Sequence, residues 1–273
     1  MLAHALRTSF FFLDHIALDI PEADITNFSL TEKQINQYHP EIVINCAAAT
    51  DVTKIEQEPH FAMLVNGEGV KNLAILCKKY NCQLVHYSTD FVFQGDQNIV
   101  YTEEMIPHPV NKYGLSKLRG EEYIREFNSK SLIIRLSWLY GPEGKNFVAQ
   151  IFPLIGEKKI IRVVADQYGK FTYTFDVADV TQKLLLAKCS GIYHFANEGV
   201  ISRYEMATKI QELLFKQSIP QHIIIPTKAI DYADHTPRPR WSILGTEKIS
   251  KAIDIKIRGW QTTLEDFIRS AAF

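Results

Sequence analysis

The chain has 273 residues, of which 46% are hydrophobic, and its formal net charge is −1. Its basic residues are scattered rather than clustered, which argues against a nucleic-acid-binding protein. No apolar run approaches the roughly 20 residues needed to cross a bilayer, so we expect a soluble, cytoplasmic protein with a substantial core and no membrane partner.

Predicted strands and helices alternate through the first half of the chain. The apolar run at residues 9–13 lacks the cleavage site of a secretion signal and is expected to be buried core. A nearly continuous apolar run at residues 41–46 is typical of a buried parallel strand, and the helical periodicity of residues 61–80 predicts the helix that follows. Further strands are expected at residues 15–18, 83–87 and 131–135, and a helix at residues 112–127. These strand-helix-strand units predict the α/β class, with a doubly wound parallel sheet.

Shorter elements are predicted beyond Trp138. They are strands at residues 160–164 and 191–195, helices at residues 176–188 and 202–215, and a loop at residues 237–239. No repeat or low-complexity linker separates them from the first half. We therefore expect C-terminal insertions that pack against the first sheet, with a boundary near residue 140.

The cysteines do not indicate a metal or redox site. Cys46, Cys77, Cys82 and Cys189 form no CxxC pair, and no histidine pair has ligand-like spacing. We expect buried free thiols and no bound metal.

Thr89, Tyr113 and Lys117 together suit the reduction of a carbonyl group. Hydride transfer to a ketone leaves an alkoxide, and a tyrosine can protonate it if its pKa, near 10 in model peptides, is lowered. Tyr113 and Lys117 are four residues apart on one helix face, so the ammonium can stabilise the phenolate and also reach a cofactor ribose. Thr89 ends the preceding strand and could bind the same carbonyl oxygen.

A tyrosine and a lysine one turn apart could also be a solvated helix face. Among the 12 tyrosines, however, only Tyr113 has a lysine four positions later. It also follows the strand that carries Thr89 at its carboxyl end, where the sites of such sheets open. This position favours the catalytic interpretation.

Seven ordered segments resemble the dTDP-4-dehydrorhamnose reductase family of extended short-chain dehydrogenases. The similar segments are residues 45–50 (NCAAAT), Asn66, residues 88–93 (STDFVF), the pair Tyr113 and Lys117, Trp138, residues 166–169 (DQYG), and Arg238-Pro239 with Ser242 and Leu244. The resemblance covers nearly the whole chain. It implies reduction of dTDP-4-dehydro-L-rhamnose to dTDP-L-rhamnose, with Tyr113 as proton donor, Lys117 tuning it and Thr89 polarising the carbonyl.

The resemblance also implies which residues bind the two ligands, and a homodimer is common among relatives. The expected cofactor contacts are Asp19, Asp24, Ile25, Ala47, Ala48, Ala49, Asn66, Tyr113 and Lys117. The expected contacts of the dTDP-sugar are Thr50, Thr89, Asp90, Trp138 and Arg238. Asp19 would accept hydrogen bonds from both ribose hydroxyls, which favours NADH. Ile20 stands where the family often has an arginine that accommodates NADPH. The expected cofactor is therefore NADPH or NADH.

The residue after Thr89-Asp90 separates this chain from related enzymes. Nucleotide-sugar dehydratases have a glutamate there that acts as acid or base, whereas this chain has Phe91. Sugar epimerases usually present paired Ser/Thr residues before Val-Tyr-Gly, and residues 89–93 differ from that pattern too. Reduction is therefore the expected reaction.

The start of the chain departs from the family pattern. In the family a strand and a glycine-rich loop precede the segment that is similar to residues 1–6, and here no glycine precedes Gly67. We expect a native N-terminus longer by about 15 residues. Residues 1–140 then form the Rossmann-like dinucleotide-binding region without its first strand and loop, and residues 141–273 mainly the nucleotide-sugar-binding region, interleaved with the sheet.

A second class of function stays open. The regulatory subunit of methionine adenosyltransferase also resembles these reductases and acts by docking an enzyme, without turnover of a sugar. An inactive truncated homologue is a further alternative. Oxidation of NAD(P)H in the presence of dTDP-4-dehydro-L-rhamnose would separate a reductase from both.

Overall fold

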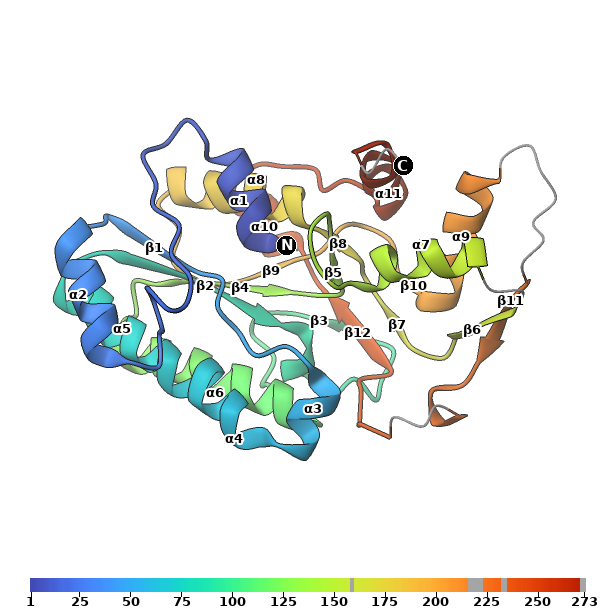
Figure 1. Cartoon of the computed structure of the whole chain (residues 1–273), viewed down its shortest axis with the longest axis horizontal. Coiled ribbons are helices and arrows are strands. Elements are labelled where there is room, and N and C mark those ends of the chain that lie inside the picture. Colours follow the sequence, from blue (N-terminus) through green and yellow to red (C-terminus); the bar gives the residue numbers. More distant parts are fainter. Residues whose placement is uncertain (158–159, 216–222, 232–234, 271–273) are drawn as a thin grey trace.

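Four parallel strands form the main sheet, in the spatial order β1-β2-β4-β9 (Figure 1). The structure is a computed structural model and describes residues 1–157, 160–215, 223–231 and 235–270. The main strands are β1 (Ile42–Asn45), β2 (Gln83–Thr89), β4 (Leu132–Leu136) and β9 (Gly191–Phe195). All of β4 and nearly all of β2 are buried, as expected for central strands covered on both faces. The strands predicted at residues 41–46, 83–87, 131–135 and 191–195 are thus confirmed.

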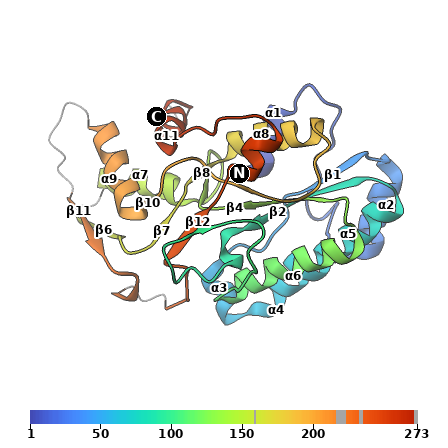
Figure 2. The same cartoon turned by 180° about the vertical axis from the view of Figure 1, so that it is seen from behind.

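Helices cover both faces of the main sheet, as the two opposite views show (Figures 1 and 2). On one face lie α2 (Phe28–Tyr38), α5 (Val70–Lys79) and α6 (Lys112–Phe127); on the other lie α1 (Leu2–Ser9), α8 (Thr174–Leu186) and α10 (Glu247–Ala252). Each face has its own apolar core. Leu73, Leu84 and Ile124 belong to the first, and Ala5 and Ile134 to the second. The predicted doubly wound α/β fold is confirmed.

The helix predicted at residues 61–80 is continuous but changes pitch. It runs through α4 (Pro59–Ala62), a π-helical segment (Met63–Gly69) and α5. Pro at the first position of α4 separates it from the short helix α3 (Val52–Gln57). The wider π-helical turn carries Asn66, which is fully buried. Such turns occur frequently at functional sites.

The second half of the chain adds small sheets beside the main one. One has the order β10-β7-β12-β3, and two pairs are β11-β6 and β5-β8. Their strands are β3 (Val100–Tyr101), β5 (Leu139–Tyr140), β6 (Ile160–Val164), β7 (Tyr168–Gly169), β8 (Thr172–Tyr173), β10 (Ile201–Ser202), β11 (Ile223–Thr227) and β12 (Trp241–Leu244). The helices are α7 (Phe147–Glu157), α9 (Arg203–Leu214) and α11 (Trp260–Ser270). The predicted strand at residues 160–164 is confirmed, and the helices predicted at 176–188 and 202–215 are α8 and α9.

Two predictions near the N-terminus are wrong. Residues 15–18 form no strand and are exposed, and the second edge of β1 pairs with no described strand. In the run at residues 9–13, Phe10 is buried, but Phe11 is 78% exposed and Phe12 58%. The helix α1 ends at Ser9, and Phe10 directly after it still packs in the core between α1 and α8. Phe11 and Phe12 lie beyond this contact and face solvent.

The two halves of the chain share the main sheet. Strand β9 follows α8 in sequence and pairs with β4, and α1 packs against α8. Among the described helices, none has the length and apolarity that spanning a membrane requires.

Candidate active site

Thr89 lies at the carboxyl end of β2, where the chain turns into a short 3₁₀ helix at residues 90–92. Its hydroxyl accepts a hydrogen bond from Phe91 N (3.2 Å) and donates one to Asp90 Oδ1 (3.1 Å). The hydroxyl is therefore held by the turn that it caps. Its proton, now given to Asp90, could be directed to a substrate oxygen with only a rotation about one bond.

Tyr113 enters the same region from the first turn of α6. Asn111 caps this helix by accepting from Gly114 N (2.8 Å). A Cβ on Gly114 would lie 2.1 Å from Phe91 O, so only glycine lets α6 approach the turn so closely. The rings of Phe91 and Tyr113 meet edge to face, with centroids 5.8 Å apart. Packing therefore places the phenol beside Thr89.

Burial and the Asp90 charge raise the pKa of Tyr113 to about 12, while the Thr89 hydroxyl acts in the opposite direction. The sequence predicts instead that Lys117 lowers this pKa. In the structure, Lys117 Nζ donates to Tyr87 O (2.6 Å) and lies 3.3 Å from His86 Nε2. Burial also lowers the pKa of Lys117 to about 8. Action of Lys117 on the phenol stays a prediction.

Asp90 is a buried carboxylate held by two hydroxyl groups. Ser137 Oγ donates to its Oδ2 (3.0 Å), and Thr89 donates to its Oδ1. Burial raises the pKa of Asp90 to about 6, although both hydrogen bonds lower it. Asp90 therefore joins the carboxyl ends of β2 and β4 beneath Thr89.

Asn66 fixes the segment that follows β1. Its Oδ1 accepts from Ala49 N (2.9 Å), and its Nδ2 donates to Ala49 O (2.9 Å) and to Ser116 Oγ (3.0 Å). The predicted cofactor segment Ala47, Ala48 and Ala49 is thereby attached to α6, one turn from Tyr113. The sequence marks Asn66 as a site residue, but its role as a clamp between two elements is visible only in the structure.

Trp138 lies between β4 and β5, half-buried, in a second group of side chains. Its φ of +39° is in the left-handed region, which is unusual for a bulky residue. The indole packs edge to face on Phe171 (5.0 Å between centroids) and lies under the Arg203 guanidinium, 4.6 Å from the ring centroid. A Cβ on Gly169 would lie 2.8 Å from the indole, so the glycine of the predicted DQYG loop makes room for this ring.

Arg238 connects the C-terminal segment to α3. Its NH2 donates to Thr53 Oγ1 (3.3 Å), and Asn111 Nδ2 donates to Pro237 O (2.8 Å). The loop predicted at residues 237–239 is confirmed and lies beside the N-terminus of α6. Its contact with Asn111 brings Arg238 near the helix that carries Tyr113.

The remaining predicted cofactor residues make local contacts away from Thr89, Tyr113 and Lys117. Asp19 is exposed and accepts from Ile20 N (2.8 Å). Asp24 Oδ1 accepts from Thr26 N (2.9 Å), and Ile25 O accepts from Asn72 on α5 (3.0 Å). Asp24 and Ile25 thus lie near the amino end of α5, whereas Thr50 is exposed after the alanine segment.

Reasoning from the sequence missed the polar residues behind Lys117. His86 is fully buried on β2 and contacts both Lys117 and Asn45. A histidine in the middle of the predicted strand at residues 83–87, directly after Leu84 and Val85, is the sequence signal that could have identified it.

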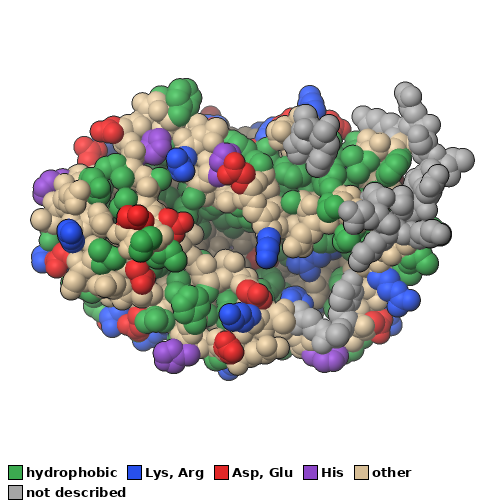
Figure 3. Space-filling model, in the orientation of Figure 1, with side chains coloured by type: hydrophobic (Ala, Val, Ile, Leu, Met, Phe, Trp, Pro, Cys, Tyr) green, Lys and Arg blue, Asp and Glu red, His purple; other side chains and the backbone are tan. Residues whose placement is uncertain are grey.

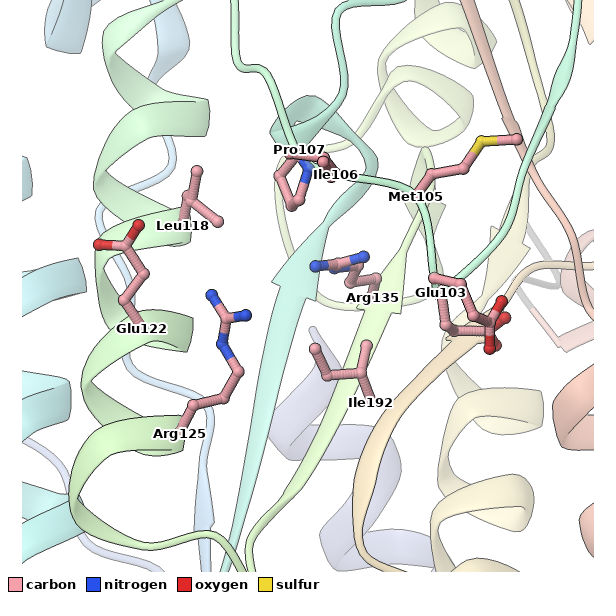
Figure 4. Close-up of a pocket in the computed structure, with 10 residues that line it drawn as sticks. Glu103, Met105, Ile106, Pro107, Leu118, Glu122, Arg125, Arg135 and Ile192 are labelled. Carbon is pink, nitrogen blue, oxygen red and sulfur yellow. The ribbon is translucent and has the colours of Figure 1, made fainter.

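A pocket of about 300 Å³ lies apart from the proposed catalytic residues. Figure 4 shows it between α6, the loop at residues 103–107 and the main sheet, with Leu118, Glu122 and Arg125 on its helix side. Its lining contains none of Thr89, Tyr113 and Lys117.

The cysteines are only partly as expected. Cys77 and Cys82 are buried, but Cys46 is exposed after the edge strand β1 and Cys189 is half-buried in the turn after α8. The expectation of four buried thiols is therefore wrong for two of them. In the part of the chain that the structure describes, no three His, Cys, Asp or Glu side chains are grouped to hold a metal ion.

Comparisons with known proteins bear on the whole chain. The family described as "RmlD substrate binding domain" matches residues 1–273. The spore coat polysaccharide biosynthesis protein SpsK of Bacillus subtilis (strain 168) is 38% identical, covering 93% of this chain and 88% of its own. The dTDP-4-dehydrorhamnose reductase of Escherichia coli (strain K12) is 34% identical, covering 90% and 86%.

A solved structure agrees with these relatives. The dTDP-4-dehydrorhamnose reductase of Bacillus anthracis str. Ames, in complex with NADP, is similar with a TM-score of 0.94 and 34% identity, covering 98% of this chain and 95% of that one. Both the family match and this level of identity extend over nearly the full length. The chain therefore belongs to the dTDP-4-dehydrorhamnose reductase family.

Proposed function

We propose that this chain reduces dTDP-4-dehydro-L-rhamnose to dTDP-L-rhamnose with a nicotinamide cofactor. The observation that carries the proposal is the placement of Tyr113 against Phe91, next to Thr89, at the carboxyl end of the main sheet. Ligands of open α/β sheets bind at this edge. The named reductases that are similar over most of this chain support the same reaction.

The residues at the end of β2 could bind the nicotinamide and ribose of such a cofactor. Ser88 Oγ is buried at the end of β2 without a hydrogen-bond partner, which favours a polar ligand nearby. The clamped alanine segment and Lys117 lie around the same strand end, and we assign them to cofactor binding with Asn66. Asp19, Asp24 and Ile25 are proposed for the adenosine side. The solved relative that contains NADP favours NADPH, and Asp19 favours NADH.

Reduction requires one hydride and one proton, and the cofactor supplies the hydride when it is bound. Thr89 would turn its hydroxyl from Asp90 to the substrate carbonyl oxygen and polarise it. Tyr113 would then give its phenolic proton to the same oxygen as the alkoxide forms. Lys117 would stabilise the resulting phenolate, which requires its ammonium to leave Tyr87 O.

The sugar would bind in the region between the main sheet and the C-terminal elements. Figure 3 shows a hollow in the middle of this face, where the main strands end in the same view of Figure 1. We propose that Trp138 lines the sugar site and that Thr50, Asp90 and Arg238 complete it. In this division residues 1–140 bind mainly the cofactor and residues 141–273 mainly the nucleotide sugar.

The comparisons favour the reductase over the non-catalytic regulatory subunit. The deciding experiment follows NADPH and NADH absorbance with dTDP-4-dehydro-L-rhamnose as substrate. A reductase oxidises the cofactor and forms dTDP-L-rhamnose, whereas a regulatory subunit leaves it unoxidised. Tyr113→Phe is the matched control, because it removes one oxygen atom and the donated proton while keeping the ring contact with Phe91.

We also propose where the protein is located and how it assembles. We place the protein in the cytoplasm, and its four unpaired cysteines fit a reducing compartment. The family resemblance favours a homodimer. Light scattering of the purified protein would measure its mass directly and would reject the dimer if only the 31.3 kDa chain were found.

A further inference from the structure

A buried chain of three polar side chains leads from β1 to the proposed active site. Asn45 on β1, His86 on β2 and Lys117 on α6 are 4%, 0% and 3% exposed. Asn45 Nδ2 lies 3.1 Å from His86 Nδ1, and His86 Nε2 lies 3.3 Å from Lys117 Nζ. The imidazole thus lies between two nitrogen atoms, each of which ordinarily donates.

The orientation of the Asn45 amide can be fixed from its other contact. Ala47 N can only donate, so the atom that faces it at 3.0 Å is the amide oxygen Oδ1. The amide nitrogen Nδ2 must then face His86, and an NH₂ group donates without accepting. His86 Nδ1 is therefore the acceptor, and the single proton of the neutral ring is on Nε2.

This tautomer directs an N–H group at Lys117. An ammonium has no lone pair and would meet that N–H unfavourably, whereas an uncharged amine can accept from Nε2 while donating to Tyr87 O. Complete burial holds the pKa of His86 well below its usual value, so the imidazole stays neutral whichever form Lys117 takes. The contacts around Nζ are thus those of an amine.

We propose that Asn45 and His86 are positioning residues that set the protonation state of Lys117, Asn45 by fixing the Nε2–H tautomer and His86 by presenting that N–H to Nζ. The inference rests on the proposed function for its kinetic consequence only. Because the charged lysine is the form that stabilises a phenolate, the pair defines the upper pH limit of the reaction.

Other ionisable groups also face Lys117. Glu121 on α6 favours the charged form. Cys46 after β1 would do so only as a thiolate, and burial of the sulfur atom raises the pKa of this thiol to about 12. Glu121, however, is bound by two nitrogen atoms of Arg135 (2.9 and 2.6 Å), which compensates much of its charge. Tyr113 lies on the preceding turn of α6. Among the described residues, His86 and the Tyr87 carbonyl are the hydrogen-bond partners of Nζ, so the tautomer of His86 acts on it most directly.

Nuclear magnetic resonance of the chain labelled with ¹⁵N-histidine tests the tautomer without any activity. The His86 signals are identified as those that disappear in His86→Gln. We expect an unprotonated Nδ1 and a protonated Nε2 near neutral pH. A protonated Nδ1 would overturn the proposal, whether or not the chain reduces a sugar.

Asn45→Asp is the variant that should reverse the tautomer. A carboxylate can still accept from Ala47 N, but it now also accepts from Nδ1–H, and the Nε2 lone pair then faces Lys117. We expect the spectrum to show the exchanged tautomer and the alkaline limb of kcat/KM to move up by about one pH unit. A purely structural role would lower kcat/KM at every pH and leave the limb in place.

The double variant Asn45→Asp with His86→Phe separates the tautomer from the added charge. Without the imidazole, the shift of the alkaline limb caused by Asn45→Asp should disappear. An equal shift in both backgrounds would mean that the carboxylate acts on Lys117 through space, and the proposal would fail. A wild-type chain that oxidises no NADPH contradicts the proposed function instead, and the spectra still decide the tautomer.

Discussion

The guanidinium of Arg203, at the start of α9, lies 4.6 Å from the centroid of the Trp138 ring, between β4 and β5. Arg203 also donates to Gln167 Oε1 (3.0 Å), so the indole is held between a cation and the loop at residues 166–169. This arrangement gives Trp138 one orientation, as a residue that lines a sugar site requires.

Trp138→Ala should therefore weaken sugar binding more than chemistry. We expect KM for dTDP-4-dehydro-L-rhamnose to rise by about tenfold or more, with kcat changed less. Gly169→Ala should cause part of the same effect, because its Cβ would lie 2.8 Å from the indole. Steady-state kinetics check both, and an unchanged KM in Trp138→Ala would remove this residue from the site.

Tyr113→Phe tests the proton donor. The variant keeps the ring packing on Phe91 and loses the phenolic proton, so turnover should fall by about two to four orders of magnitude. Fluorescence titration should show cofactor binding close to that of the parent chain. If turnover persists at the parent level, another group donates the proton.

Lys117→Met should lower activity and cofactor affinity but raise stability. The pKa of Lys117 is lowered from 10.5 to about 8, so its buried charge costs about 3 kcal/mol below pH 8, and this cost disappears as pH rises from 8 to 10.5. The parent should therefore gain stability over that range relative to the variant. Urea unfolding at pH 7 and pH 10 measures the difference, and parallel curves would contradict the assignment.

Asp90→Asn should flatten the pH dependence of stability in mild acid. Burial raises the pKa of Asp90 from 3.8 to about 6, so the folded state binds this proton more tightly than the unfolded state. The Asp90 contribution to the free energy of unfolding should fall by about 3 kcal/mol as pH rises from 3.8 to about 6. Ser137→Ala should act in the opposite direction, because it removes a hydrogen bond that lowers this pKa and so should steepen the dependence. Urea unfolding between pH 4 and pH 7 measures both variants, and equal slopes in Asp90→Asn and the parent chain would contradict the assignment.

Glu121→Gln should be strongly destabilising. Glu121 and Arg135 are 0% and 1% exposed, and removing one charge leaves the other buried without its partner, which typically costs about 3–5 kcal/mol. Glu122→Gln on the same helix is the control, since its bond to Arg119 is half-exposed and should contribute about 1 kcal/mol or less. Similar losses in the two variants, measured by urea unfolding, would argue against this difference.

The sequence was most informative where a pattern depends on local chemistry. The helix predicted at residues 112–127 has those bounds in the structure, and the Asn111 side chain caps its start. The strand expected at residues 15–18 is absent, because a strand needs a neighbour and periodicity cannot supply one. The sequence predicts that Tyr113 lies near Thr89. The close approach of Gly114 to the turn after β2 brings the two residues together.

The environment of Lys117 could not be predicted in the same way. Its spacing from Tyr113 shows only that both side chains share a helix face. Its contacts with His86 and Tyr87 O depend on how α6 crosses β2, which is a long-range property of the packed fold. Likewise, the approach of Arg238 to Thr53 joins residues that are 185 positions apart.

The position of β9 in the main sheet has a consequence for how the gene could be divided. A fragment that ends at residue 140 would lack this strand and α8, so β4 would lose one of its two partner strands and α1 its packing surface. Neither half could therefore be expressed as an autonomous folding unit, despite their separate proposed ligands. Calorimetry should accordingly record one cooperative transition for the intact chain, and a cofactor bound to one half should stabilise both.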